Sequence, residues 1–426
     1  MNYRKRIADK LLANKLKGMG AVLVTGAKWC GKTTTSEQLA HSVLYMDNPK
    51  DRSMNIQMAQ LNPSMLLSGP TPRLIDEWQI APELWDAIRF EVDHRDEEGQ
   101  FILTGSATPL NASDEGKIHH SGAGRIARLI MRPMTLWESG ESNGQISLEL
   151  LFGSADNLYG VNKQELTDIA WLICRGGWPR AVNQDKNISL GRAFDYYDTV
   201  VNVDITESDG VERNPERVKL LMRSYARNQG TQVSLSAICA DMKANDNDTL
   251  DDRTVYSYIK ALKSIFVVED TKAWNPNLRS KAAIRTSDTH YFTDPSIAVA
   301  ALGIGPNDLI NDLNTMGLFF ETLCMRDLRV YAQSLEGEVY HYRDSDGLEC
   351  DAVVHLRNGS YGLIEIKLGG ETLIEVGAKT LQKLVKKIDT TKMKKPSFLM
   401  VLTATGKYAF KRADDVWVVP IGCLKD

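Results

Sequence analysis

Short apolar runs alternate with amphipathic stretches over the first third of the chain. Four apolar runs predict buried strands, although the third is short because Pro72 and Arg73 precede it, and helical patterns separate them. They lie at residues 21–25, 43–46, 74–75 and 101–103. Strands that alternate with helices are typical of an α/β fold with a parallel sheet, in which ligands bind beyond the carboxyl ends of the strands. The pattern predicts such a sheet within residues 1–138.

The pattern changes character after this region. Residues 139–213 are mixed and helical, with a break at Gly176-Gly177-Trp178-Pro179. Three helical patterns follow at 216–228, 234–243 and 251–264, and then two short β-like runs at 265–270 and 290–293. Three helices and a two-stranded wing are typical of a winged helix-turn-helix. We therefore expect four domains: a core at 1–138, a helical lid at 139–213, a winged helix at 214–305 and an α/β domain at 306–426.

Length and composition agree with a division into several domains. A chain of 426 residues is too long for one ordinary core, and 43% hydrophobic with 25% charged residues is typical of a globular protein. The net charge of −4 neither requires nor excludes a polyanionic partner. The six cysteines show no C-x-x-C spacing, so neither a disulfide framework nor a zinc site is indicated. No run has the length of a membrane span, and we expect a cytoplasmic protein without a membrane partner.

The strongest local motif directly follows the first apolar run. Residues 26–33 read Gly-Ala-Lys-Trp-Cys-Gly-Lys-Thr, which satisfies G-x-x-x-x-G-K-[ST]. The glycines let backbone N–H groups surround a phosphate, Lys32 can reach the β- and γ-phosphates, and Thr33 offers a hydroxyl to Mg²⁺. We predict a phosphate-binding loop. Its candidate ligand residues are Gly26, Ala27, Lys28, Trp29, Cys30, Gly31, Lys32, Thr33 and Thr34.

Two carboxylates follow the third apolar run. Asp76 and Glu77 stand where a strand would deliver them to a bound nucleotide, Asp76 to hold Mg²⁺ through water and Glu77 to orient or deprotonate the attacking water. Acidic pairs at strand ends also act as helix caps, which is the alternative. The fourth run leads to Thr104-Gly105-Ser106, where Ser106 could contact the γ-phosphate or simply form a turn.

In their order along the chain, these motifs resemble those of a known family. The loop, the Asp76-Glu77 pair, residues 101–107, Gly122-Ala123-Gly124-Arg125 and the stretch 132–138 are similar to the AAA-type predicted ATPases (AAA_14-like) of bacteria and archaea that end in the domain DUF4143. The resemblance implies an AAA-type P-loop fold, ATP as the ligand, and hydrolysis to ADP and phosphate. It also implies that Arg125 is an arginine finger in a homo-oligomer. The alternative is that Arg125, Arg128 and Arg132 lie on the exposed face of a strand.

A second group of polar residues lies near the end of the sequence. Two strands around a turn at 357–359 would put Glu349 and Asp351 on one face, and Glu365 and Lys367 on one face of the next strand. Asp351 and Glu365 could then bind Mg²⁺, with Lys367 stabilising the attacking water or the charge on phosphorus. With Glu321, the pattern resembles the PD-(D/E)xK nucleases, which implies a restriction-endonuclease-like fold. An amphipathic hairpin with its polar face in water is the alternative.

Local charge permits a nucleic-acid partner. Residues 217–290 contain 12 basic and 8 acidic residues, and residues 379–395 contain seven lysines and one acid, a run that also fits a solvated helix face. We therefore expect a Mg²⁺-dependent ATPase that acts on DNA through its winged-helix and nuclease-like domains. The first alternative is an ATP-dependent switch that binds a partner protein and has an inactive terminal domain. The second is a small-molecule phosphotransferase.

Overall fold

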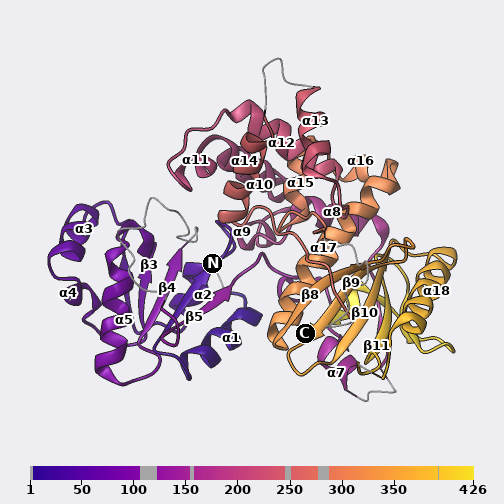
Figure 1. The fold of residues 1–426 in the computed structure, drawn as a ribbon, viewed down its shortest axis with the longest axis horizontal. Helices are drawn as coiled ribbons and strands as arrows, with labels where there is room; N and C mark the ends of the chain where they lie inside the picture. The colour runs from indigo at the N-terminus through magenta and orange to yellow at the C-terminus, as the bar shows by residue number, and fades with distance from the viewer. Residues whose placement is uncertain (1–2, 106–121, 154–157, 245–250, 277–286, 392) are drawn as a thin grey trace. The chain divides into compact units, whose positions relative to one another are not determined.

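The computed structural model describes residues 3–105, 122–153, 158–244, 251–276, 287–391 and 393–426, and it contains two compact units (Figure 1). Unit 1 comprises Met1–Pro133, Val203–Glu212 and Lys260–Phe266. Unit 2 comprises Met134–Asn202, Arg213–Ile259 and Val267–Asp426. Within the described ranges, no helix is both long enough and apolar enough to cross a membrane.

Unit 1 is built on a five-stranded parallel sheet. Its strands stand in the order β2-β3-β4-β1-β5, and every neighbouring pair is parallel. They are β1 (Ala21–Thr25), β2 (Ser42–Tyr45), β3 (Arg73–Asp76), β4 (Phe101–Gly105) and β5 (Ile126–Ile130). The predicted parallel α/β sheet is thus confirmed. Because all five strands run the same way, the segments that follow β1, β3 and β4 emerge at one edge of the sheet.

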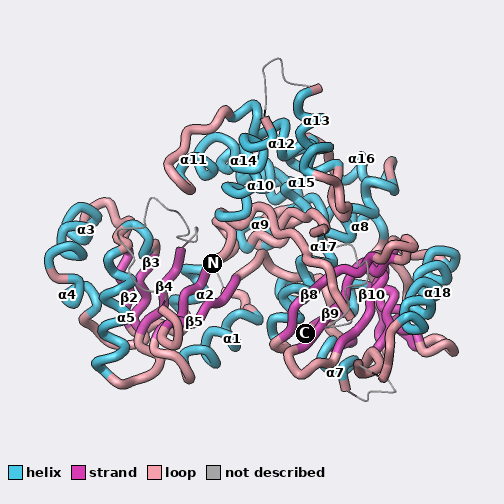
Figure 2. The backbone as a smooth tube through the Cα atoms, viewed as in Figure 1, coloured by secondary structure: helices cyan, strands magenta, loops and turns pink. Residues whose placement is uncertain are grey.

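Helices cover both faces of this sheet, as the tube in Figure 2 shows. One face packs against α1 (Ile7–Leu16) and the region of α2 (Lys32–Glu37). The other packs against α3 (Arg52–Leu61), α4 (Pro63–Leu67) and α5 (Glu83–Arg95), with the short η1 (Trp78–Ile80) beside them. Strands buried on both faces need continuous apolar runs, which explains the pattern of the first third of the chain.

The helical part of unit 2 is organised around two buried groups. Trp178 packs on Tyr196 with ring centroids 4.3 Å apart and donates its indole N–H to Ser296. The buried Arg326 forms ion pairs with Asp294 and Asp327. The helices are α6 (Leu136–Ser139), α8 (Leu166–Arg175), α9 (Pro179–Val182), α10 (Lys186–Thr199), η3 (Val200–Asp204), α11 (Ile205–Glu207), α15 (Pro295–Leu302), α16 (Pro306–Asn311) and α17 (Leu313–Ser334). Of these, α11 and the last two residues of η3 belong to unit 1.

The three helices expected for the winged helix are present as α12 (Pro215–Arg227), α13 (Leu235–Lys243) and α14 (Asp252–Ser264). The Asn214 and Ser234 side chains cap the first two, accepting from the backbone N–H groups of Glu216 and Ala237. The expected strands at 265–270 and 290–293 are reduced to isolated bridges, Val268 with Phe292 and Thr271 with Thr289. Phe266 has a φ of 59°, which interrupts an extended run.

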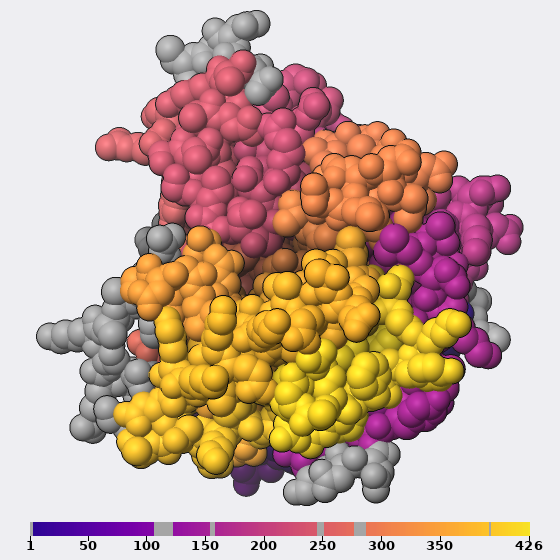
Figure 3. Space-filling view, turned by 90° about the vertical axis from the view of Figure 1, so that its right-hand side faces the viewer, coloured from indigo at the N-terminus to yellow at the C-terminus, as the bar shows by residue number. Residues whose placement is uncertain are grey.

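A seven-stranded mixed sheet dominates the rest of unit 2. Its order is β7-β12-β13-β11-β10-β9-β8, with parallel pairs at β10–β11 and β11–β13. The strands are β7 (Gly160–Val161), β8 (Gly337–Arg343), β9 (Glu349–Leu356), β10 (Tyr361–Lys367), β11 (Phe398–Thr403), β12 (Tyr408–Lys411) and β13 (Val416–Pro420). One face packs against α18 (Glu371–Lys387). In Figure 3 the orange and yellow atoms of this region form a continuous surface.

Residues of the expected lid contribute to this terminal region. The strand β7 pairs with β12, and β6 (Ile146–Ser147) pairs with β14 (Leu424–Lys425). The remaining short elements are α7 (Leu148–Phe152) and η4 (Ile421–Cys423). A strand of two residues has no recognisable pattern of alternation, so the composition of residues 139–213 did not indicate these pairings.

Candidate functional site

The loop between β1 and α2 has a backbone that requires glycine. Gly26 has a φ of 149° and Gly31 of 98°, and Trp29 adopts the left-handed region at 65°. A Cβ at Gly26 would lie 1.9 Å from the Met131 carbonyl oxygen, so no larger residue fits. Gly31 is the N-cap of α2. Backbone geometry therefore explains why both positions of the motif are glycine. The loop follows β1 at the carboxyl edge of the sheet.

The Lys32 side chain folds back over this loop. It is only 6% exposed, and its ammonium donates to the carbonyl oxygens of Gly26 at 2.9 Å and Ala27 at 3.0 Å. These partners are neutral. Phosphate oxygens, which carry negative charge, make stronger charge-assisted hydrogen bonds to an ammonium than carbonyl oxygens do.

Two hydroxyl groups converge on Asp76 at the end of β3. Thr33 Oγ1 donates to Asp76 Oδ1 at 2.8 Å, and Thr104 Oγ1 donates to the same oxygen. Burial raises the pKa of Asp76, while these two hydrogen bonds lower it and the nearby Asp47 and Glu37 raise it. A hydroxyl and a carboxylate 2.8 Å apart are oxygen donors of the kind that Mg²⁺ takes beside a bound nucleotide. Thr33 and Asp76 therefore fit the ion that the motif implies.

Glu77 begins the turn that follows β3. It has a φ of 53°, and its carboxylate accepts a hydrogen bond from Gln79 Nε2. Burial raises the pKa of Glu77, whereas the Gln79 hydrogen bond and the charges of Lys32 and Lys28 lower it. Although Glu77 is the N-cap of η1, its side chain makes no capping hydrogen bond. The Glu77 carboxylate therefore does not act as a helix cap, which was the alternative.

The remaining predicted loop residues differ in exposure. Ala27 and Cys30 are buried, whereas Trp29 and Thr34 are exposed. Lys28 forms an ion pair with Asp204, described below. Ser106 lies outside the described residues, so its expected contact with the γ-phosphate stays a prediction.

Arg125 lies away from the loop of its own chain. It immediately precedes β5, and its carbonyl oxygen accepts from Ala21 N, at the amino end of β1. Because β1 and β5 are parallel, Arg125 is at the edge of the sheet opposite Gly26. Its guanidinium is exposed and pairs with Asp93 at 2.8 Å. The structure thus does not bring Arg125 together with Lys32 and Glu77, and a role in a neighbouring subunit stays a prediction.

Sequence reasoning missed two charged residues at the loop. Arg6 is buried and donates to the Cys30 carbonyl oxygen at 2.9 Å and to that of Arg132 at 2.8 Å, which connects the loop to the segment that follows β5. Asp204 accepts from Lys28 across 176 positions of sequence. The only signal for Asp204 in the sequence was its position as a carboxylate inside the apolar run 200–205. A charge in such a run is expected to be buried, and a buried charge needs a partner.

The terminal region brings three predicted residues together. Lys367 Nζ lies 3.0 Å from Asp351 Oδ2 and 2.7 Å from Glu365 Oε2. Asp351 Oδ2 also accepts from Ile366 N at 2.7 Å. Asp351 is on β9 and the other two are on β10, and these strands pair antiparallel around the expected turn. The predicted convergence of carboxylates and an amine is therefore present.

Glu321 on α17 belongs to the same electrostatic group and accepts a hydrogen bond from Tyr291. Burial and then the Asp351 charge raise the pKa of both Glu321 and Glu365. Carboxylates that oppose each other's ionisation favour a cation, so Asp351 and Glu365 fit as holders of a divalent ion. Across the described parts of the chain, however, no three His, Cys, Asp or Glu side chains are close enough to form a metal site, and Lys367 completes the group instead.

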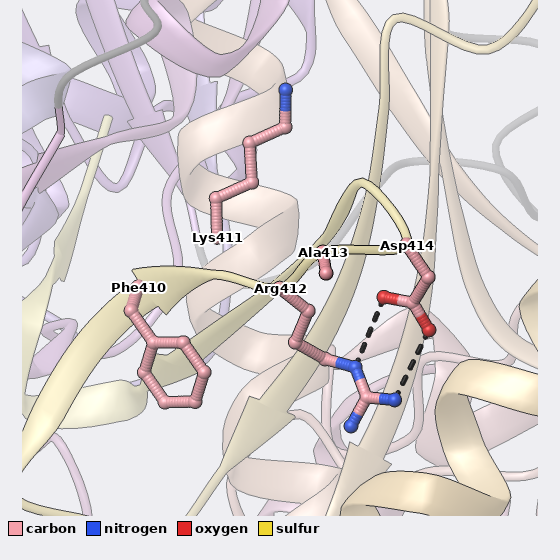
Figure 4. A pocket seen from close by; sticks show the side chains of 5 residues that line it. All are labelled: Phe410, Lys411, Arg412, Ala413 and Asp414. Atoms are coloured by element: carbon pink, nitrogen blue, oxygen red, sulfur yellow. Dashed lines mark hydrogen bonds and ion pairs between the residues drawn. The ribbon is translucent and has the colours of Figure 1, made fainter.

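Two lysines of α18 are paired with acids. Lys379 pairs with Glu375, and Lys387 with Asp344 and Asp346. Beside this helix is a shallow hollow lined by Phe410, Lys411, Arg412, Ala413 and Asp414 (Figure 4). The Arg412 guanidinium in it is bound by Asp414 and Glu375. The hollow therefore does not offer an unneutralised cation, and Lys392 of the lysine run lies outside the described residues.

Comparison with known proteins identifies three regions. Residues 19–139 match an AAA domain, residues 166–308 a domain of unknown function (DUF8612), and residues 316–424 a domain of unknown function (DUF4143). The chain thus contains an AAA domain, which implies nucleotide binding, and it ends in the DUF4143 domain that the sequence led us to expect.

Similar proteins are found in mycobacteria and archaea. The chain is 25% identical over 373 residues to the Uncharacterized protein Rv2008c of Mycobacterium tuberculosis and to the Uncharacterized protein Mb2031c of Mycobacterium bovis. Each match covers 86% of this chain and 74% of the relative. Among solved structures, the Walker-type ATPase PABY2304 of Pyrococcus abyssi is 14% identical, with a TM-score of 0.41, over 69% of this chain and 94% of that one.

Proposed function

We propose that this chain binds ATP with Mg²⁺ and hydrolyses it to ADP and phosphate at the loop between β1 and α2. The observation that carries this proposal is the group formed by Lys32, Thr33, Asp76 and Glu77 at one edge of the parallel sheet. A triphosphate held by the loop would lie between an ammonium, a pair of oxygen donors for Mg²⁺ and a carboxylate for water. The AAA domain at residues 19–139 supports the same reading.

Each residue has a distinct task in this reaction. Lys32 exchanges its carbonyl partners for oxygens of the β- and γ-phosphates, and Thr33 and Asp76 hold Mg²⁺, Asp76 through water. The bound ion neutralises charge that develops on the phosphate oxygens. Glu77 orients a water molecule and accepts its proton as the water oxygen forms a bond to the γ-phosphorus, while the bond from that phosphorus to the bridging oxygen of ADP breaks. Burial raises the pKa of Glu77, and the Lys32 and Lys28 charges oppose that rise and so favour the ionised form that this task needs.

The Lys32→Ala variant tests the proposal. Loss of the ammonium should abolish ATP hydrolysis, measured as phosphate release, and weaken ATP binding, measured by calorimetry. Lys17→Ala is the matched control, because Lys17 is an exposed lysine of the same unit. Unchanged hydrolysis by Lys32→Ala would refute the assignment.

We also propose that the active form is a homo-oligomer in which Arg125 enters a neighbour's site. The support is its position at the sheet edge opposite its own loop, together with its exposure. Mixing Lys32→Ala with Arg125→Ala should restore hydrolysis, because some interfaces then combine an intact loop with an intact arginine. Mixtures no more active than the separate variants would leave Arg125 as a surface partner of Asp93.

A second proposed function concerns DNA. The convergence of Asp351, Glu365 and Lys367 favours Mg²⁺-dependent cleavage of a phosphodiester, with the three-helix region at 214–305 as the DNA-contacting part. Incubation with Mg²⁺, ATP and several forms of DNA distinguishes the possibilities. Cleavage that is lost in Lys367→Ala supports a nuclease, and ATP turnover stimulated by DNA without cleavage supports a switch with an inactive terminal domain. If DNA has neither effect, the partner is a protein.

A further inference from the structure

Lys28 of the phosphate-binding loop is held by an acidic residue that no motif identifies. Its Nζ lies 2.6 Å from Asp204 Oδ1 and 3.5 Å from Glu207 Oε2. The Asp204 side chain is 3% exposed, whereas that of Glu207 is 64% exposed. Since solvent screens the longer and exposed contact, Asp204 is the main partner of Lys28.

Both loop lysines act on the Asp204 carboxylate. Burial raises the pKa of Asp204, the Lys28 hydrogen bond and charge lower it, and Lys32 lowers it further. The same two ammonium groups act on Glu77 across the loop. A triphosphate bound by the loop would thus place its terminal negative charge in the electrostatic neighbourhood of Asp204, where it competes for the same cations.

Asp204 occupies an unusual place in the chain. It is the last residue of η3, a π-helical segment (Val200–Asp204) that continues α10 and leads into α11. A π-helix is rare, is usually limited to a single turn, and is frequent at functional sites. Residues Val203–Glu212 belong to unit 1, although the residues before and after them belong to unit 2. A change in the position of Asp204 therefore moves backbone that is continuous with both units.

We propose that Lys28 exchanges between two anionic partners, the Asp204 carboxylate and the terminal phosphate of ATP, and that Asp204 is the positioning residue through which residues 200–207 respond to the γ-phosphate. Release of Lys28 by Asp204 would then free residues 200–207 when ATP, rather than ADP, occupies the loop. This inference rests on the proposed ATP site and adds to it a link between the presence of the γ-phosphate and the state of residues 200–207.

The affinities of Asp204→Asn for a non-hydrolysable ATP analogue and for ADP test the proposal in the full-length chain. Asparagine keeps the shape of the side chain but gives up its charge, so Lys28 is free for the phosphate. The affinity of Asp204→Asn for the analogue should exceed that of the wild type by about fivefold or more, a ratio typical of coupled sites. Its affinity for ADP should change little. If the role of Asp204 were purely structural, Asp204→Asn would bind both ligands more weakly, and to a similar degree. Asp198→Asn, an exposed aspartate on α10, is the matched control.

Lys28→Met completes the experiment. If the gain in Asp204→Asn arises through Lys28, the double variant Lys28→Met/Asp204→Asn should lose it and bind the analogue no more tightly than Lys28→Met alone. An equal gain in the double variant would contradict the exchange.

Hydrogen exchange of the wild-type chain gives a second measurement, which does not depend on the stability of a variant. The ATP analogue should raise amide exchange within residues 200–207, and ADP should not. Reduced or unchanged exchange with the analogue would overturn the inference.

The outcomes separate this inference from the proposed function. If the wild type binds ATP, Lys32→Ala does not, and Asp204→Asn shows the wild-type ratio of the two affinities, only the role of Asp204 fails. If the wild type binds neither ligand, the ATP site fails and the inference with it.

Discussion

The two lysines Lys32 and Lys367 show how one side-chain type serves two kinds of site. Lys32 donates to two neutral carbonyl oxygens of its own loop, so its positive charge is not cancelled by these partners. Lys367 donates to two carboxylates, one on each of two paired strands. The first arrangement favours an incoming anion. The second has its charge already compensated within the chain, and it gains most from a divalent cation that takes over the carboxylates.

The neighbouring acids reinforce this difference. Around the loop, burial raises the pKa of Glu77, but the Gln79 hydrogen bond and the positive charges of Lys32 and Lys28 oppose this rise. In the terminal cluster, burial and the Asp351 charge raise the pKa of Glu365, and the same influences raise that of Glu321. We therefore expect the loop to respond to nucleotides and the terminal cluster to metal ions and pH, and three variants test these responses separately.

Glu77→Gln should give the largest effect. The amide cannot deprotonate water, so kcat for ATP hydrolysis should fall by about 10²- to 10⁴-fold, while ATP binding persists because Lys32 is intact. Phosphate release and calorimetry measure the two quantities. Glu98→Gln, an exposed acid of the same unit, should behave as the wild type. Hydrolysis at the normal rate in Glu77→Gln would exclude Glu77 as the group that acts on water.

Lys367→Ala should have an intermediate effect, on stability. Its removal leaves Asp351 and Glu365 facing each other without a cation, which should cost about 2–3 kcal/mol in the free energy of unfolding. Added Mg²⁺ should recover part of this loss by replacing the missing charge, and should stabilise the variant more than the wild type. Denaturant unfolding measures both effects, with the exposed Lys383→Ala of α18 as the control. No response of the variant to Mg²⁺ would show that the two carboxylates do not hold the ion.

Glu321→Gln should have the smallest effect, visible as a change with pH. The pKa of Glu321 is higher in the folded chain than in the unfolded chain, so the folded state holds the proton more tightly. The protonated Glu321 therefore stabilises the folded state fully below the ordinary glutamic acid pKa, and this contribution is lost as pH rises towards the raised pKa. Gln keeps an acceptor for Tyr291 but does not ionise.

The Glu321→Gln variant should therefore become more stable relative to the wild type as pH rises, by at most about 1.4 kcal/mol per pH unit. Unfolding free energies measured between about pH 5 and pH 8 provide the check. Glu149→Gln, an exposed acid of the same unit, should keep the wild-type slope. A constant difference between Glu321→Gln and the wild type would mean that Glu321 does not titrate differently in the folded state.

Contiguous features were the most predictable from the sequence. The strand β1 has the expected bounds, and β3 and β4 extend the expected runs by one or two residues, because buried parallel strands require apolar runs. The hairpin of β9 and β10 was equally clear, since its turn at Gly359 has a φ of 81° and needs a glycine there. From these two regions the sequence assigned Thr33 and Asp76 to one Mg²⁺ site, and the structure places them in direct contact. It also predicted that Asp351, Glu365 and Lys367 can converge, as they do.

Features that depend on distant segments were not predictable. The contact of Asp204 with Lys28 requires a π-helical turn at one particular position, which no local pattern indicated. The strands β6 and β7 are too short to show alternation and are defined by their partners β14 and β12. In the expected wing, Phe266 leaves the extended conformation, and so a β-like run became isolated bridges.

The pairing of β6 with β14 has a consequence for how the protein is made. Ser142 donates to the Leu424 carbonyl oxygen, 282 positions further along the chain. During translation, the segment that contains β6 and β7 leaves the ribosome long before its partner strands exist, and contacts of such long range form slowly. Unit 2 can therefore complete these pairings only after Leu424 has been synthesised.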